Sequence, residues 1–271
     1  MAIELASARY RYAGSASAAL GPIDLRVEEG RVVGVAGANE SGKSTLCLVA
    51  AGLAPGVIGG KRDGSVRIDG ADAAALKPHE LAQRCGILFQ HAATQLSHST
   101  ATVFEEVAFG PCNLGLRIPE VVERVWAALR AAGVEALAAR DPGRLSGGQA
   151  QLVALASVLA MRPKYLILDE PTSELDPAGT TLVADALTRV AAETGAGILL
   201  IEHKTDVLAR IADEVIVLER GAVALSGPAA AVLADPRLSD LGVEPPAAVR
   251  LERAVRAAAI EWSAALAEAV R

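Results

Sequence analysis

The sequence predicts an α/β fold: a mostly parallel sheet, an antiparallel β subdomain and an inserted helical subdomain. Three observations carry this prediction. Short, continuous apolar runs alternate with helix-like segments, one run instead alternates apolar and polar residues, and a long insertion with helical periodicity separates the first two apolar runs. The 271 residues, 52% of them hydrophobic, are enough for one large domain with a sizeable core.

The strands of the parallel sheet are expected where apolar runs are short and continuous, which is typical of strands buried on both faces. These runs are residues 31–37, 165–170, 197–202 and 214–219. Helices are expected at 44–51, 179–192 and 205–212. The segment "GSVRIDG" (64–70) differs, because Val66 and Ile68 alternate with polar residues as in a half-exposed antiparallel strand.

The insertion is expected to form a helical subdomain at about 91–155. Its clearest helix is 118–133, with Pro119 near the start and Gly133 at the stop. The apolar residues of one helix face are Val121, Val125, Ala128 and Leu129. We expect the main domain to cover 1–225, and 226–271 to form a mostly helical tail.

Composition narrows the function classes. The formal net charge of −6 argues against broad nucleic-acid binding. The first ten residues lack a signal-peptide pattern and no apolar run is long enough to span a bilayer, so a cytoplasmic protein is expected. The scattered cysteines are expected to be reduced, partly buried thiols: Cys47, Cys85 and Cys112. Three histidines are expected at the surface: His79, His91 and His98.

The segment "GANESGKST" (37–45) matches the phosphate-loop pattern G-x-x-x-x-G-K-[ST], between a buried strand and a helix, and predicts a P-loop NTPase. Lys43 would reach the β- and γ-phosphates, and the Ser44 hydroxyl would ligate Mg²⁺. The expected nucleotide-binding residues of the loop are Gly37, Asn39, Ser41, Gly42, Lys43, Ser44 and Thr45. The Glu40 side chain is expected to point to solvent, because the middle positions contribute backbone only.

Other candidate catalytic residues follow strands of the same sheet. Asp169 ends "YLILD" and would hold Mg²⁺, through water, while Glu170 would orient the attacking water. His203 would contact the γ-phosphate or that water, although a lone histidine is often a satisfied structural residue. Gln90, ending "GILFQ", could reach Mg²⁺ or water.

In order along the chain, the phosphate loop, Gln90, "LSGGQ", "LILDEP", "SELD" and His203 resemble the ATP-binding cassette (ABC) family over about 3–225. The resemblance implies that residues 1–225 are an ABC ATPase domain using ATP and Mg²⁺. It implies a head-to-tail dimer in which "LSGGQ" binds the partner's γ-phosphate through Ser146, Gly147, Gly148 and Gln149. A helix cap at Ser146 is the local alternative.

The same resemblance implies that Tyr12 stacks on the adenine, with Tyr10 a less favoured substitute, and that Asp176 lies at the dimer interface. Ordinary strand roles for both tyrosines remain the alternative. Two departures stand out: Leu152 occupies a position where many members carry arginine near the ATP interface, and "IEHK" (201–204) replaces the commoner "THD".

A narrower likeness lies in Gln95 and "TVFEEVAFGPCNLGL" (102–116), with "LSDLGVEPP" (238–246) in the tail. These resemble the ATPases of energy-coupling factor (ECF) transporters, which import vitamins or nickel and cobalt ions. The likeness implies a peripheral protein at the cytoplasmic face of the cell membrane. Its partners would be a second ABC ATPase subunit, the same or a related chain, and integral membrane subunits that dock on the helical subdomain.

Other classes remain as alternatives. A soluble, non-transport ABC ATPase that acts in assembly or as a scaffold fits the chain length. A DNA-maintenance ATPase is disfavoured because no long heptad pattern is present. A passive nucleotide-binding module is disfavoured because Glu170 and His203 are both present.

Overall fold

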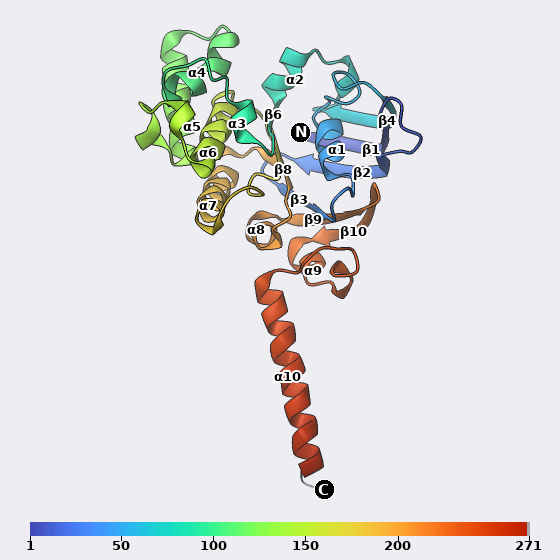
Figure 1. The fold of residues 1–271 in the computed structure, drawn as a ribbon. Helices are drawn as coiled ribbons and strands as arrows, with labels where there is room; N and C mark the ends of the chain where they lie inside the picture. Colours follow the sequence, from blue (N-terminus) through green and yellow to red (C-terminus); the bar gives the residue numbers. More distant parts are fainter. Residues whose placement is uncertain (270–271) are drawn as a thin grey trace.

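The computed structural model describes residues 1–269, with side chains at all of these except 92–93 and 259–269. Within this part of the chain, ten strands form two sheets (Figure 1). The strands are β1 (Ala2–Arg11), β2 (Leu20–Glu28), β3 (Val32–Gly37), β4 (Lys61–Ile68), β5 (Ala71–Asp72), β6 (Cys85–Leu88), β7 (Tyr165–Asp169), β8 (Gly197–Ile201), β9 (Glu214–Glu219) and β10 (Ala222–Pro228).

The larger sheet has the strand order β10-β9-β3-β8-β7-β6, and the smaller has the order β2-β1-β4-β5. Strands β9, β3, β8, β7 and β6 are parallel, and β10 adds an antiparallel edge. The smaller sheet is antiparallel throughout. The predicted α/β class is confirmed, including the antiparallel subdomain around 64–70, whereas β2 and β10 were not predicted.

Strand β3 shows why the continuous apolar runs become central strands. Val32 and Ala36 belong to the core that includes the helical subdomain, and Val33 and Val35 belong to a second core. Neighbours β7 and β8 alternate between the two cores in the same way. A strand with a core on each face needs apolar side chains at every position, which is why no polar alternation was visible in these segments.

The described helices are α1 (Lys43–Ala50), α2 (Pro78–Arg84), α3 (Ala92–Gln95), α4 (Val103–Asn113), α5 (Ile118–Ala132), α6 (Gly147–Ala160), α7 (Pro177–Thr194), α8 (Thr205–Ile211), α9 (Ala229–Leu233) and α10 (Ala247–Ala269). Helix α1 lies between the two sheets and contacts strands of both. Helices α3 to α6 form a lobe to one side of the molecule (Figure 1), as expected for 91–155.

Helix α5 follows the predicted pattern closely. Its four predicted apolar residues are buried, and Gly133 ends the helix in the left-handed conformation at φ 73°. Helix α6 lies at the centre of the lobe, where it contacts α4, α5 and α7. The lobe is therefore packed around α6, whose N-terminus carries the "LSGGQ" segment.

We expect Leu155→Ala to destabilise the protein strongly. Leu155 lies on α6, is 0% exposed and belongs to the core shared by the lobe and the larger sheet. Truncating such a side chain removes buried apolar surface and leaves a cavity, at a cost of about 2–5 kcal/mol in the free energy of unfolding. Denaturant unfolding would measure this cost. The matched control is Leu251→Ala, because Leu251 is 66% exposed and exposed sites usually change stability by less than about 0.5 kcal/mol.

The expected boundary between the main domain (1–225) and the tail (226–271) does not coincide with a boundary in the structure. Strand β10 crosses residue 225, and Val232, Leu238 and Val243 are buried in the main core. The compact domain thus extends to Val243, and only α10 projects away from it (Figure 1). Over the described residues, no helix is both long enough and apolar enough to cross a membrane.

Most of the expected exposures of the histidine and cysteine side chains agree with the structure. The side chains of His79, His91 and His98 are exposed, as predicted. Cys47 and Cys85 are buried, and burial raises the pKa of the Cys47 thiol. Cys112 is exposed rather than partly buried, because it lies on the outer face of α4.

Candidate active site

The phosphate loop connects β3 to α1, as its sequence predicts. Gly42 has a φ of 103°, and a Cβ there would lie 2.9 Å from the Ala19 carbonyl oxygen. A Cβ on Gly37 would lie 2.5 Å from Ser41 Oγ. Both positions therefore require glycine, and the loop closes tightly around the N-terminus of α1, where backbone N–H groups and the helix dipole favour an anion.

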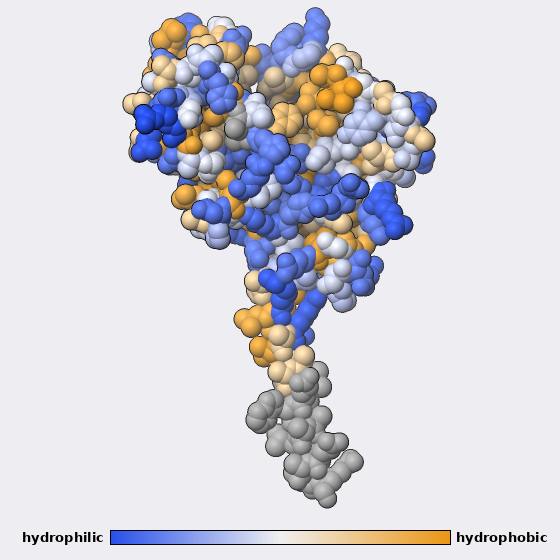
Figure 2. All heavy atoms as spheres, viewed as in Figure 1, coloured by the Kyte–Doolittle hydropathy of each residue, from blue (hydrophilic) through white to orange (hydrophobic). Residues whose placement is uncertain are grey.

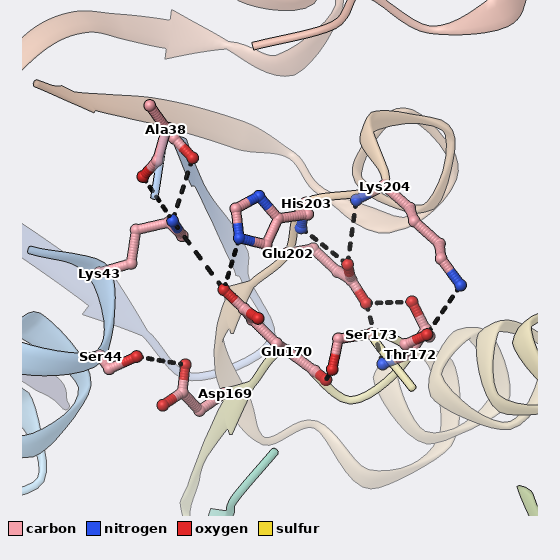
Figure 3. A network of polar contacts seen from close by, with 11 residues as sticks. Ala38, Lys43, Ser44, Asp169, Glu170, Thr172, Ser173, Glu202, His203 and Lys204 are labelled. Atoms are coloured by element: carbon pink, nitrogen blue, oxygen red, sulfur yellow. Dashed lines mark hydrogen bonds and ion pairs between the residues drawn. The ribbon is translucent and has the colours of Figure 1, made fainter. Parts of the chain in front are cut away.

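Lys43 is 5% exposed, and its ammonium group lies against its own loop (Figure 3). Its Nζ donates hydrogen bonds to the carbonyl oxygens of Gly37 at 3.0 Å and Ala38 at 2.8 Å. Glu170 Oε1 lies 3.9 Å from Nζ. Burial lowers the pKa of Lys43, and the nearby carboxylates of Glu170 and Asp169 oppose that shift. The loop thus holds a cation at a place where it can bind phosphate oxygens.

Asp169, at the end of β7, lies beside the start of α1. Its Oδ1 accepts a hydrogen bond from Ser44 Oγ at 3.3 Å. Burial raises the pKa of Asp169, and the hydrogen bond from Ser44 opposes the shift. A hydroxyl and a carboxylate oxygen at this spacing fit Mg²⁺, which keeps several waters and takes its other ligands from phosphates. No group of three or more His, Cys, Asp or Glu side chains that could hold a metal ion occurs among the described residues.

Glu170 and His203 form a pair at the carboxyl ends of adjacent strands β7 and β8 (Figure 3). Glu170 Oε1 lies 2.8 Å from His203 Nε2. The hydrogen bond from His203 lowers the pKa of Glu170 and outweighs burial, which acts in the opposite direction. Glu170 also has a left-handed backbone, φ 49°, which is unusual for a non-glycine residue and typical of active sites. The arrangement keeps Glu170 ionised and its side chain fixed.

A cavity of about 760 Å³ brings eight of the predicted site residues together. Its lining contains Asn39, Gly42, Lys43, Ser44, Thr45, Gln90, Glu170 and His203. Glu40 is exposed at its rim, as expected. Residues 17–19 and Arg220 also line the cavity and were not predicted. Arg220 follows β9, which is a parallel neighbour of β3. Its position after a strand of the same sheet could have indicated that it lies near the phosphate loop.

Four predicted residues support the cavity without lining it. Gly37 and Ser41 pack together beneath the loop, and Asp169 lies behind Ser44. The hydroxyls of Tyr12 and Thr45 are 3.1 Å apart, so the half-buried Tyr12 ring lies beside the cavity. Tyr10 is 1% exposed and contacts Tyr12 edge-on, which makes it a poor substitute for Tyr12 in stacking.

The "LSGGQ" segment lies outside this cavity. Ser146 is the N-cap of α6 and accepts a hydrogen bond from the Gln149 N–H at 3.4 Å, while Gln149 Oε1 accepts one from the Ser146 N–H at 3.2 Å. The local helix-cap interpretation is therefore confirmed. Asp176 caps α7 in turn, accepting from the Gly179 N–H at 2.7 Å. Because Gly148 lies close to Gly179, the two segments form one surface.

Two further positions depart from or extend the sequence interpretation. Leu152 is 5% exposed and belongs to the core shared by the lobe and the larger sheet, so its side chain packs inside the subunit. Gln95 donates to the Ile87 carbonyl oxygen at 2.7 Å and accepts from the Phe89 N–H at 2.9 Å. It thus fixes the strand end that carries Gln90.

A parallel sheet with a phosphate loop, a Ser–Asp pair suited to Mg²⁺ and an ionised glutamate beside a histidine defines a P-loop nucleotide-binding fold. The chain matches the family model described as ABC transporter over residues 20–173. It is 41% identical to a putative ABC transporter ATP-binding protein of Methanosarcina mazei over 90% of this chain and 41% of that protein. It therefore spans about two fifths of that relative's length, as it does for one from Methanosarcina acetivorans.

It is also 38% identical to the energy-coupling factor transporter ATP-binding protein EcfA2 of Caldanaerobacter subterraneus, over 89% of this chain and 83% of that one. Among solved structures it is similar to cbiO1 of Clostridium perfringens, described as part of the ABC transporter complex cbiONQ (TM-score 0.78, 31% identity, 93% and 98% of the chains). The dimeric ATP-binding cassette MJ0796 bound to ADP and Pi is similar as well (TM-score 0.70, 26% identity, 84% and 98%). The chain belongs to the ABC transporter family.

Proposed function

We propose that this chain is the ATP-binding and ATP-hydrolysing subunit of an ABC importer of the ECF type, acting as a head-to-tail dimer. One observation carries the dimer: the cavity gathers the phosphate loop, Gln90, Glu170 and His203, yet the "LSGGQ" residues lie elsewhere on the surface. A helix N-terminus with exposed Ser146 and Gly147 fits a phosphate that this chain's own loop cannot present to it.

The residues around the cavity fit ATP with Mg²⁺. Lys43 and the N–H groups around Gly42 to Thr45 bind the phosphates, and Tyr12 stacks on the adenine from beside Thr45. Ser44 and Asp169, with Gln90, hold the metal ion directly or through water. The Mg²⁺ ion would neutralise charge on the β- and γ-phosphates.

Hydrolysis follows from the Glu170–His203 pair. Glu170 is ionised and accepts a hydrogen bond from the attacking water, which it orients in line with the γ-phosphate. His203 holds the Glu170 carboxylate through Nε2 and lies within reach of the γ-phosphate. Ser146, Gly147, Gly148 and Gln149 of the second subunit complete the site, with Asp176 at the interface.

An apolar patch on the helical lobe suits contact with membrane subunits. Exposed large hydrophobic residues gather on α4 and α5, namely Phe109, Ile118, Val122 and Trp126. Figure 2 shows apolar surface on this lobe among polar side chains. The similarity to EcfA2 and to cbiO1 of the cbiONQ complex supports the ECF type. In that role the protein is peripheral at the cytoplasmic face of the membrane and drives uptake of a vitamin or of nickel or cobalt ions.

The alternative is a non-transport ABC ATPase that acts in assembly or as a scaffold. The exposed patch on α4 and α5 favours the transporter instead. Purification of the tagged chain from its own host's membranes decides between them. An integral membrane protein that co-purifies with the wild type, and is lost with Val122→Glu, supports the transporter. Recovery of the chain without any membrane protein supports the alternative.

The shared site is tested by mixing two inactive variants. Gly147→Asp places a negative charge where the partner's γ-phosphate would bind, and its Cβ has room because the nearest atom, Leu175 Cδ2, lies 3.7 Å away. We expect it to bind ATP normally but to hydrolyse it on the order of 100-fold more slowly, because like charges at an interface cost several kcal/mol.

Lys43→Ala has an intact "LSGGQ" and a defective phosphate loop. A mixture of the two variants forms heterodimers with one complete site, so we expect hydrolysis to return to a substantial fraction of the wild-type rate. Each variant measured alone at the same total concentration is the control. A mixture no faster than the sum of its parts would contradict a site shared between two copies of this chain.

A further inference from the structure

Two charged residues flank His203 without lining the cavity. Glu202 and Lys204 stand at the carboxyl end of β8, in the "IEHK" segment that departs from the commoner pattern. Figure 3 shows that their side chains point toward the turn that follows Glu170, on the side away from Lys43 and Ser44. We call this turn, residues 171–176, the interface turn, because it leads to Asp176.

Glu202 ties the His203 backbone to the interface turn. Its side chain is 0% exposed, and its carboxylate accepts hydrogen bonds from the Thr172 N–H at 3.1 Å and from the Thr172 hydroxyl. The other oxygen accepts from the N–H groups of His203 at 2.8 Å and Lys204 at 3.1 Å. Four donors satisfy this buried carboxylate, so the backbone of His203 is fixed relative to Thr172.

Lys204 ties the same segment to the far end of the turn and to α7. Its Nζ donates to the carbonyl oxygens of Thr172 at 2.7 Å and Leu175 at 3.2 Å, and to Thr180 Oγ1 at 2.6 Å. An ammonium group has three donors, and all of them are used here. Lys204 thereby fixes the residue before Asp176 and the first turn of the helix that Asp176 caps.

These contacts close a loop of interactions. Glu170 contacts His203 directly, Glu202 and Lys204 bind the turn that begins after Glu170, and that turn ends at Asp176. A displacement of the interface turn would therefore move the His203 backbone and change the 2.8 Å contact between His203 Nε2 and Glu170 Oε1.

We propose that Glu202 and Lys204 are positioning residues for ATP hydrolysis, which hold His203 against Glu170 and link this pair to the position of the interface turn. The inference rests on the proposed catalytic roles of Glu170 and His203 and deepens them. When a second subunit contacts Asp176, the link sets the Glu170–His203 pair in its active geometry.

The test is a double-mutant cycle on the full-length chain, with radiolabelled ATP under single-turnover conditions. Lys204→Met removes the three hydrogen bonds and keeps much of the side-chain length. We expect its hydrolysis rate to fall on the order of tenfold, because small displacements of catalytic groups have effects of that size or larger, while its ATP affinity stays unchanged. In a His203→Ala background we expect Lys204→Met to cause no further loss, since it acts through His203.

Lys204→Arg, which keeps the charge and the donors, should recover part of the rate, and Lys77→Met at an exposed site should match the wild type. The inference is overturned if Lys204→Met matches the wild type, or if it slows hydrolysis by the same factor in both backgrounds, as a merely structural defect would. If Lys204→Met fails to fold, Thr180→Val removes one acceptor at nearly constant shape and is carried through the same cycle.

The proposed function fails in a different way. If His203→Ala hydrolyses ATP at the wild-type rate, the catalytic role of His203 is wrong, and the positioning role falls with it. If His203→Ala is slow while Lys204→Met and Thr180→Val are normal, only the positioning role is wrong.

Discussion

Replacement of Lys43 by alanine is expected to abolish ATP binding. The Lys43 ammonium group is buried, and both of its hydrogen-bond acceptors are carbonyl oxygens of the loop itself, so its charge is held beside the cavity by the loop. A charge-assisted hydrogen bond contributes about 1.5–3 kcal/mol, and the loss of two such bonds to phosphate lowers affinity on the order of 100-fold or more. Titration calorimetry with ATP and Mg²⁺ measures this loss.

The control for this variant is Lys77→Ala, which removes an exposed lysine at the start of α2. It should bind ATP as the wild type does. Thermal unfolding of both variants checks that Lys43→Ala is folded, since the change leaves the Gly37 and Ala38 carbonyl oxygens without their donor. Normal ATP affinity in folded Lys43→Ala would contradict the assignment of residues 37–45 as the phosphate site.

Replacement of Glu170 by glutamine is expected to leave ATP binding intact and to slow hydrolysis by about 10²- to 10⁴-fold, the usual contribution of a positioned general base. The amide keeps the shape of the side chain, but it loses the negative charge that His203 and Lys43 favour in the wild type. The bound ATP then persists. Phosphate release measures the rate, and Glu123→Gln, at an exposed position on α5, is the control.

The same variant tests the proposed dimer, because ATP that is not hydrolysed would keep two subunits closed on each other. Light scattering of Glu170→Gln with ATP and Mg²⁺ should show a dimer, and the same sample without ATP a monomer. A monomer with ATP bound would mean that "LSGGQ" of this chain pairs with a different ATPase subunit. Hydrolysis near the wild-type rate would instead move the catalytic role away from Glu170.

Several elements were predictable because their signals are local. The phosphate loop could be recognised from glycines at a fixed spacing, because a tight anion-binding turn requires them. Gly42 has a backbone conformation that favours glycine, with φ 103°. Helix α5 could be predicted because its apolar residues are spaced so that they lie on one face, which packs against the rest of the lobe. The strand ends that carry Asp169, Glu170 and His203 could be placed because parallel strands present their carboxyl ends at one edge.

Other features depend on contacts between distant segments and left no local signal. Leu152 stands where many family members carry arginine, and only the packing of α6 shows that its side chain is buried in the core. The sequence of strand β10 lacks a clear pattern of apolar and polar residues. It forms a strand because it pairs with β9, which would otherwise be an unpaired edge of the sheet. Residues 229–243 join the core, although they were expected to belong to a helical tail that begins at 226.

The sequence by itself determined the family, the chemistry of the phosphate loop and the set of side chains available for hydrolysis, because those depend on residue types at fixed short spacings. Only the tertiary structure decided that Gln90, Glu170 and His203 share one cavity while "LSGGQ" faces elsewhere. Only it decided that Glu202 and Lys204 join His203 to the turn before Asp176. The physical reason is that hydrogen bonds between residues about 30 positions apart depend on how the sheet orders its strands, and that order follows from burying both faces of the sheet at once.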